Sequence, residues 1–212
     1  MSPALPKQAF LAPPEVNKAP LLRGVDTPWE HLAGAFVELG SGDLSCRTSA
    51  AVSLLIRAQS EGETVAWIEP VGGGLFPPDL AEAGVELSSL VVVRVPMDSL
   101  KLARAAELLL RSGAFGCVVL DLSEGAPRRD AWQSRLAGLA RKHGASLVVL
   151  SPGEDQRASL GAMVSLRCIA ERRRRAPGLF SLSPRILKSR LAHRPGANLF
   201  PARPFRAPWG LR

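Results

Sequence analysis

The sequence has few cysteines and no long apolar segment. Its three cysteines, Cys46, Cys117 and Cys168, stand far apart, which argues against a disulfide framework and a metal cluster and fits a reducing compartment. Apolar runs such as 90–93 and 117–120 are far shorter than the ~20 residues that cross a bilayer. The N-terminus holds prolines in place of the charged and apolar regions of a secretory signal. We therefore expect a cytoplasmic protein with no membrane partner.

The composition supports one folded domain with a basic C-terminal region. Of the 212 residues, 46% are hydrophobic and 22% are charged, so a sizeable core can be buried. Residues 171–212 hold 11 Lys and Arg against a single Glu, a net charge of +10, whereas the rest of the chain has a net charge of −2. This asymmetry predicts contact with an acidic protein, a nucleic acid or an anionic surface.

Proline content divides the chain into three parts. Residues 1–33 form a leader in which six prolines fall within the first 30 positions, so a regular element is not expected there. Residues 34–194 form the predicted core. Residues 195–212 form a tail that is rich in proline and arginine and has no periodicity. We expect the leader and the tail to be flexible extensions.

Within the core, short buried runs alternate with segments of helical periodicity. This pattern predicts an α/β fold with a mostly parallel sheet and helices on both faces. The turn Ala176-Pro177-Gly178 separates the last two predicted strands. Strands are expected at 35–39, 64–68, 90–94, 117–121, 146–150, 164–170 and 179–188, and helices at 48–59, 99–111 and 131–143.

The first strand, loop and helix, residues 37–48, have the layout of a phosphate-binding loop. A working loop has the form GxxxxGK[ST], with backbone amides around the phosphates and a lysine on their oxygens. Aligned on Thr48, a candidate magnesium ligand, this chain has Ser41 and Cys46 at the glycine positions and Arg47 at the lysine position. Ser45 precedes the second of these positions, and Asp43 would repel phosphate. We expect no cofactor here, with Mg-ATP as the alternative.

Several segments together resemble the bacterial recombinase RecA over about residues 36–196. The resemblance implies a RecA-like core in which Asp121 holds the position of the Walker B carboxylate. The alternative, which we favour, is a purely structural role in which Asp121 caps the turn after its strand. The matching segments are 38–48, 63–69, 111–114, the strand ending at 121, 135–137, 165–167 and 186–190.

The departures from RecA fall on its functional parts. The resemblance places Val71 where RecA proteins have a catalytic glutamate, and valine cannot orient or deprotonate water. Ser151 and Pro152 replace an Asn-Gln pair that senses nucleotide. The segments 121–135 and 152–161 are too short for the DNA-binding loops, and the leader lacks the element that joins RecA protomers. The resemblance therefore implies a core without hydrolysis, DNA loops or self-polymerisation.

This combination is similar to the ImuA family, through the loop Glu-Leu-(x)n-Ser-x-Arg-Thr at 38–48 and the strand Ile-Leu-Lys-x-Arg at 186–190. The resemblance implies a non-catalytic adaptor in translesion synthesis and SOS mutagenesis. Its expected partner is ImuB, a Y-family-like polymerase subunit, together with an error-prone C-family polymerase and RecA. Two alternatives are a SulA-like division inhibitor, which also keeps a RecA-like core, and a nucleotide-gated ATPase that uses Arg47, Thr48 and Asp121.

Basic residues supply the candidate partner contacts. Lys188 and Arg190 match a Lys-x-Lys pattern that in RecA filaments reaches the neighbour's nucleotide, and we expect them at a partner interface or, alternatively, on a solvated strand edge. The tail is expected to dock on a partner or on its own core, with base stacking as a third option. The tail residues concerned are Arg203, Phe205, Arg206 and Trp209.

A run of four arginines is the second basic feature. We place Arg172, Arg173, Arg174 and Arg175 at a strand end or hairpin, because a strand alternates faces and cannot direct all four into one groove. We expect them to contact either an acidic protein or DNA phosphate, and in the second case the chain would bind DNA directly. The alternative is that they form a solvated turn. Cys46 is either a reactive thiol beside a helix N-terminus or, as we favour, a tolerated replacement of glycine. No metal site is expected.

Overall fold

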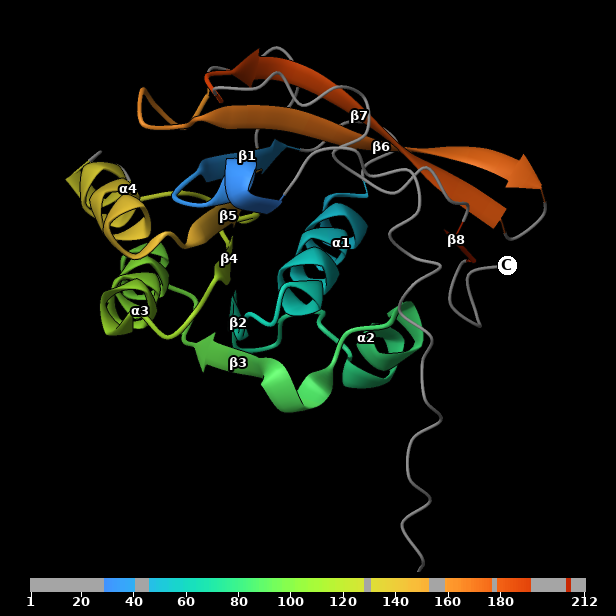
Figure 1. The fold of residues 1–212 in the computed structure, drawn as a ribbon, viewed down its shortest axis with the longest axis horizontal. Coiled ribbons are helices and arrows are strands. Elements are labelled where there is room, and N and C mark those ends of the chain that lie inside the picture. The colour runs from blue at the N-terminus through green and yellow to red at the C-terminus, as the bar shows by residue number, and fades with distance from the viewer. Residues whose placement is uncertain are drawn as a thin grey trace, which may run out of the picture.

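An eight-stranded mixed sheet forms the centre of the computed structural model, which describes residues 29–40, 46–127, 131–152, 159–176 and 179–191, and the backbone of 205–206. The strand order is β3-β2-β4-β5-β1-β6-β7-β8 (Figure 1). Pairing is parallel from β3 to β6 and antiparallel from β6 to β8. The strands are β1 (Phe36–Gly40), β2 (Val65–Pro70), β3 (Leu90–Val95), β4 (Cys117–Asp121), β5 (Ser146–Leu150), β6 (Leu166–Ala176), β7 (Leu179–Ser189) and β8 (Phe205–Arg206).

Four α-helices cover the two faces of this sheet, which confirms the predicted α/β class with a mostly parallel sheet. No helix in the described part of the chain is long and apolar enough to cross a membrane. The helices are α1 (Arg47–Ser60), α2 (Pro77–Ala83), α3 (Ser99–Ser112) and α4 (Ala131–His143), and two 3-10 helices are η1 (Trp29–Leu32) and η2 (Leu87–Ser89).

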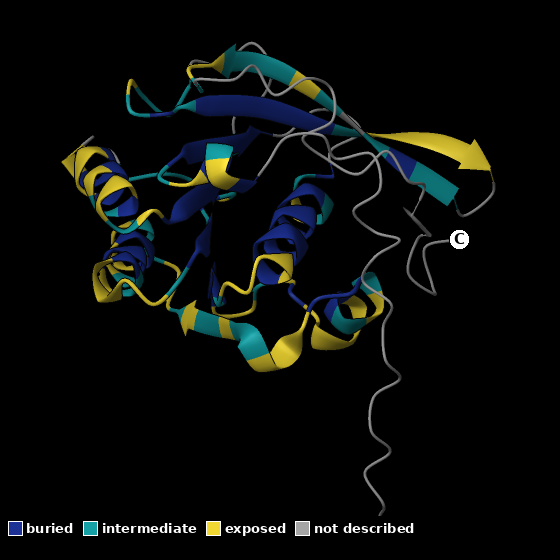
Figure 2. Cartoon of the chain, in the orientation of Figure 1, coloured by how far each residue is buried: buried dark blue, intermediate teal, exposed yellow. Residues whose placement is uncertain are grey.

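Strand alternation separates the core into two layers. On one side, Val37 and Leu39 pack with α1 and α2, and on the other Phe36 packs with α3 and α4. The five residues of β1 are all buried, as are those of β5 (Figure 2). A parallel strand covered by helices on both faces requires such a continuous apolar run, and the buried Glu38 inside β1 is therefore a marked exception.

Two elements differ from the sequence prediction. The expectation of no regular element over residues 1–30 is wrong at its end, because Trp29 begins η1 and is buried against the core, with the Arg57 guanidinium 5.9 Å from its ring centroid. The helix α2 was not expected. It spans only seven residues and buries only Leu80, so it leaves little hydrophobic periodicity, although prolines suit its first turn. Residues 1–28 lie outside the described residues.

The strand β6 is longer than expected. Predicted to end at Ala170, it continues to Ala176 and carries all four arginines of the run within it. The reason is its antiparallel pairing with β7, which continues to the pair Ala176 and Leu179 and satisfies the backbone of the arginine segment. The arginines therefore lie in the distal part of a paired hairpin. They are not placed in an irregular turn.

Candidate functional site at the carboxyl edge of the sheet

The backbone at Cys46, the second glycine position of the phosphate loop, is engaged within the protein. Its N–H donates to the carbonyl oxygen of Ala170 on β6, at 3.0 Å. Phosphate loops and helix N-termini bind anions through N–H groups that point at the ligand. At this position the N–H points to β6. Ser41, Asp43 and Ser45 lie outside the described residues.

Arg47, at the lysine position, also has a partner within the chain. Its Nη1 donates to the backbone carbonyl of Ser151, 3.1 Å away. Ser151 follows β5 and holds the position of the nucleotide-sensing pair. The structure thus brings these two predicted positions together, but as a link between α1 and the end of β5. Thr48, the neighbouring candidate magnesium ligand, is exposed in the first turn of α1.

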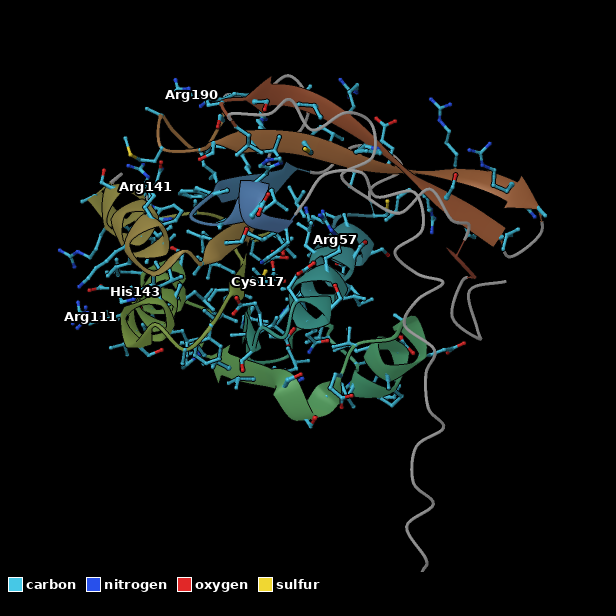
Figure 3. All side chains as sticks on the ribbon, in the orientation of Figure 1. Arg57, Arg111, Cys117, Arg141, His143 and Arg190 are labelled. Carbon is cyan, nitrogen blue, oxygen red and sulfur yellow. The ribbon has the colours of Figure 1, made fainter. Side chains whose placement is uncertain are left out.

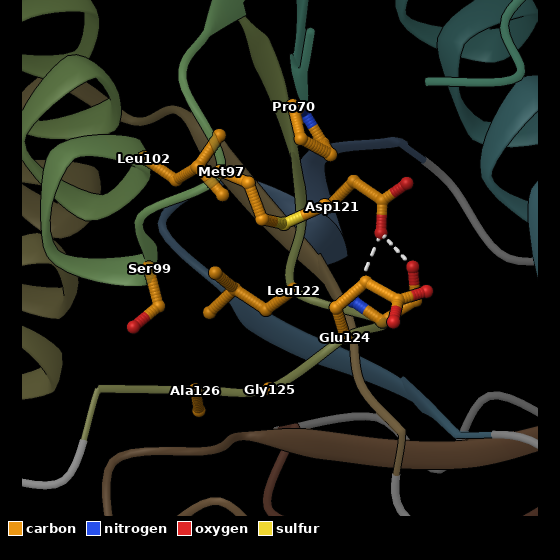
Figure 4. A pocket seen from close by; sticks show the side chains of 10 residues that line it. Pro70, Met97, Ser99, Leu102, Asp121, Leu122, Glu124, Gly125 and Ala126 are labelled. Atoms are coloured by element: carbon orange, nitrogen blue, oxygen red, sulfur yellow. Dashed lines mark hydrogen bonds between the residues drawn. The ribbon is translucent and has the colours of Figure 1, made fainter. Parts of the chain in front are cut away.

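Asp121, at the end of β4, caps the turn that follows it. Its Oδ1 accepts from the backbone N–H of Ser123 at 2.9 Å and from the hydroxyl of the same residue. Asp121 also lines a cavity of about 210 Å³ beside Met97 and Leu102 (Figure 4). Ligand pockets commonly have volumes of about 300–1,000 Å³, and no residue of α1 lines this one. This cavity therefore does not join Asp121 to Arg47 or Thr48 among the residues that the structure describes.

Val71 lies on an exposed loop after β2 and is 65% exposed. The nearby carboxylate, Glu69, is buried and holds the loop in place: Oε1 accepts from Arg94 Nε at 2.9 Å, and Oε2 accepts from the backbone N–H of Leu75 at 3.2 Å. A Cβ at Gly73 would clash with the Glu69 carboxylate and lie 2.9 Å from the Pro70 carbonyl oxygen, so the loop favours glycine there. Both carboxylate oxygens of Glu69 thus take part in contacts that hold the loop.

The group that organises this edge is Glu38, which the sequence analysis included in the motif at 38–48 but to which it gave no role of its own. Its carboxylate is 1% exposed. Oε1 accepts from the Ser151 hydroxyl at 3.1 Å, and Oε2 accepts from the Ser159 hydroxyl at 2.7 Å and from the Leu160 N–H at 3.1 Å. The buried Arg167 Nε lies 3.6 Å from Oε1. The only sequence signal was a charged residue within an otherwise apolar strand.

Lys188 and Arg190 extend this network from the end of β7. Lys188 Nζ donates to the Gly161 carbonyl at 3.3 Å, and Arg190 Nη1 donates to the Ala162 carbonyl at 3.0 Å. Partial burial lowers the pKa of Lys188, the neighbouring Arg190 lowers it further, and Glu38 opposes both effects. Arg190 itself is exposed at the end of the hairpin (Figure 3). The two predicted partner residues thus share one surface with residues 159–163.

The tail is described only over the backbone of β8, where Phe205 pairs with Phe180 and Arg206 pairs with Leu179. The backbone of residues 205–206 thus folds back onto the chain, against the distal end of β7, whereas the expectation named the core. Arg203 and Trp209 lie outside the described residues. Among the side chains that the structure describes, no group of three or more His, Cys, Asp or Glu could hold a metal ion.

The reactive-thiol reading of Cys46 is wrong. Burial raises the pKa of Cys46 to about 12, even though Arg172 lowers it, and burial alone raises the pKa values of Cys117 and Cys168 to about 12. The thiolate is the reactive form. We expect all three cysteines to resist a chromogenic disulfide reagent at pH 8 and to react within the dead time after unfolding in denaturant. Rapid reaction of one thiol in the native protein would contradict the placement of Cys46.

Comparison with protein-family models and with curated proteins gave no match for this chain. The resemblance to RecA and ImuA thus rests on the motifs quoted above. The function is inferred from those motifs together with the geometry of the carboxyl edge.

Proposed function

We propose that this protein is a non-catalytic, RecA-like adaptor in translesion DNA synthesis and SOS mutagenesis, acting in the bacterial cytoplasm. Its partner would be an ImuB-type, Y-family-like polymerase subunit, which it would connect to an error-prone C-family polymerase and to RecA. The observation that carries the proposal is the internal use of the phosphate-loop groups. The Cys46 N–H donates a hydrogen bond to the Ala170 carbonyl, and the Arg47 guanidinium donates one to the Ser151 carbonyl.

Catalytic inactivity is supported by three further features of the same edge. Val71 offers no group to activate water, Asp121 caps its own turn, and Glu69 is buried in a salt bridge with Arg94. Hydrolysis of a nucleoside triphosphate requires a positioned water, a metal-bound phosphate and cations on its oxygens. Among the corresponding positions that the structure describes, Val71 is apolar and Arg47 and Asp121 are engaged within the protein, while Thr48 remains exposed.

The partner surface that we favour combines the end of β7 with residues 159–163. Lys188 and Arg190 fix this segment through backbone carbonyls, and Glu38 fixes it from beneath through Ser159 and Leu160. A surface that is held in one shape before binding loses less entropy when a partner docks. The tail, which pairs with β7 through Phe205 and Arg206, would supply a second contact through Arg203 and Trp209.

Nucleotide binding is tested by thermal unfolding with and without millimolar Mg-ATP. A ligand at about 100 times its Kd adds roughly 2.7 kcal/mol of stability, which in a domain of this size raises Tm by about 5–10 °C. We expect no shift in Tm for the native chain. A shift of that size, lost in Arg47→Ala, would overturn the non-catalytic part of the proposal and favour a nucleotide-gated switch.

Partner binding is tested by co-expression with the ImuB-type subunit of the same organism, followed by affinity capture and titration. The double variant Lys188→Gln with Arg190→Gln removes two charges but keeps amide donors for the loop carbonyls. We expect it to weaken binding about tenfold. The matched control, Lys101→Gln with Lys142→Gln, removes two charges from exposed positions on α3 and α4 and should bind normally. Failure of the native chain to capture the subunit would refute the adaptor function.

A further inference from the structure

The distal part of the β6–β7 hairpin leaves the core while its strands remain paired. The first five residues of β6 are buried, Glu171 is half-buried, and residues 172–176 are all exposed. Pairing with β7 nevertheless continues from Glu171 and Ser183 to Ala176 and Leu179. Figures 1 and 2 show this end of β6 projecting past α1 with its surface exposed. This distal part, residues 171–176 and 179–183, is called the ribbon here; its exposed side is β6, whereas β7 lies between β6 and β8 and its Ser181 is buried.

Arginine side chains occupy both faces of this ribbon. Arg172 and Arg174 share one face by strand alternation, and the Arg172 guanidinium lies 5.0 Å from the centroid of the Phe180 ring. Arg175 follows a register shift, and its Nε donates to the Ser181 hydroxyl at 2.9 Å. Because Ser181 is the cross-strand partner of Arg173, Arg173 and Arg175 share the opposite face. Two of the four guanidiniums are therefore held in place by β7.

The charge of the ribbon is not neutralised within the described part of the chain. The only carboxylate on its described residues, Glu171, pairs with Arg185 at 3.5 Å. The arginines of the run have no carboxylate partner among the residues that the structure describes. A guanidinium is a planar fork that fits phosphate oxygens and stays charged at every physiological pH. The ribbon is therefore suited to a polyanion.

The choice between a nucleic acid and an acidic protein follows from the apolar surface. Protein interfaces gain most of their affinity from aromatic or aliphatic anchors that enter pockets. The large exposed apolar side chains of the described structure lie elsewhere, and none is on the ribbon: Val71, Phe76, Leu87, Val91, Met97, Leu100 and Leu108. An exposed cationic ribbon without such an anchor is typical of phosphate-backbone contact.

We infer that the ribbon binds double-stranded DNA through the phosphate backbone, without selecting a sequence. The exposed arginines of β6 lie on both faces of the strand and can reach phosphate oxygens, which carry no sequence information. This inference does not depend on the polymerase partner. The ribbon lies at the opposite end of the β6–β7 hairpin from Lys188 and Arg190.

The test is fluorescence anisotropy of a labelled, random-sequence DNA duplex with the full-length protein at several salt concentrations. The variant is Arg173→Gln with Arg174→Gln, because these two exposed arginines make no side-chain hydrogen bond or ion pair with the described residues and their loss should leave Tm unchanged. Each phosphate contact contributes about 0.9 to the slope of log K against log salt. We expect the variant to bind at least tenfold more weakly and its slope to fall by about 2.

The control Lys101→Gln with Lys142→Gln removes the same charge from α3 and α4 and should keep the native slope. Equal slopes for both variants would mean that only net charge attracts DNA, and would overturn the inference. Absence of salt-sensitive duplex binding by the native chain would also overturn it. Binding of poly-glutamate as tightly as the duplex, with the same loss in the ribbon variant, would assign the ribbon to an acidic protein instead.

Discussion

Replacing Glu38 by alanine is expected to lower the free energy of unfolding by about 3–5 kcal/mol, a large part of the stability of an ordinary domain. The carboxylate is buried and faces the equally buried Arg167. The substitution takes away a carboxylate that lies 3.6 Å from the Nε of that buried guanidinium. The hydroxyls of Ser151 and Ser159 and the N–H of Leu160 lose their acceptor as well.

Urea denaturation followed by circular dichroism measures this loss. The exposed Glu61→Ala on the end of α1 serves as the control, with an expected change below about 0.5 kcal/mol. The double variant Glu38→Leu with Arg167→Met removes both charges and should recover much of the stability, because replacing a whole buried ion pair by apolar groups is often neutral. A single variant that loses less than about 1 kcal/mol would show that Glu38 is not buried as described.

The hydrogen bonds at the carboxyl edge of the sheet show how much of the candidate site could be predicted from the sequence. Aligning the phosphate loop on Thr48 correctly placed Cys46 and Arg47 at the start of α1. The alignment could not show that the Cys46 amide and the Arg47 guanidinium are engaged with Ala170 and Ser151. Those partners lie more than 100 residues away in the sequence, and a hydrogen bond over that distance leaves no local pattern.

The core strands were predicted well because their signal is local. Cys117–Asp121 and Ser146–Leu150 are short continuous apolar runs, which the helices on both faces of a parallel sheet require. In Ala131–His143, apolar residues recur at the helical period, and turn residues flank the segment in the sequence. For these three segments the predicted and observed bounds are the same.

Elements that depend on distant contacts were not predicted. Trp29 closes a proline-rich leader, and its packing beside Arg57, together with the burial of Leu32, makes η1 part of the core. The four arginines lie at a strand end in a hairpin, as expected, but the strand before them was predicted to end at Ala170, and pairing with β7 extends it to Ala176. In both cases tertiary pairing overrides what the local composition indicates.

A second large effect is expected at Glu107, where α3 packs against α4. Its carboxylate is buried and lies against three guanidiniums: Arg104 Nη1 at 2.6 Å, Arg135 Nη1 at 3.3 Å and Arg111, which also donates to it. Glu107→Gln keeps the size of the side chain but leaves three clustered cations without a counter-charge. We expect Tm at pH 7 to fall by several degrees, whereas Glu82→Gln on the exposed face of α2 should leave Tm unchanged.

The pH dependence of this difference identifies the charge as its cause. Hydrogen bonding to Arg104 is the largest influence on the Glu107 carboxyl, and together with Arg135 it holds the pKa below the ordinary range of glutamate, although burial opposes the shift. A group with a depressed folded pKa contributes stability above its unfolded pKa of about 4.3 and loses it as the pH falls through the folded value. The Tm difference between the native chain and Glu107→Gln should therefore be constant from about pH 7 to pH 5 and shrink below about pH 4. A difference that persists unchanged in acid would mean that Glu107 acts through packing and not through its charge.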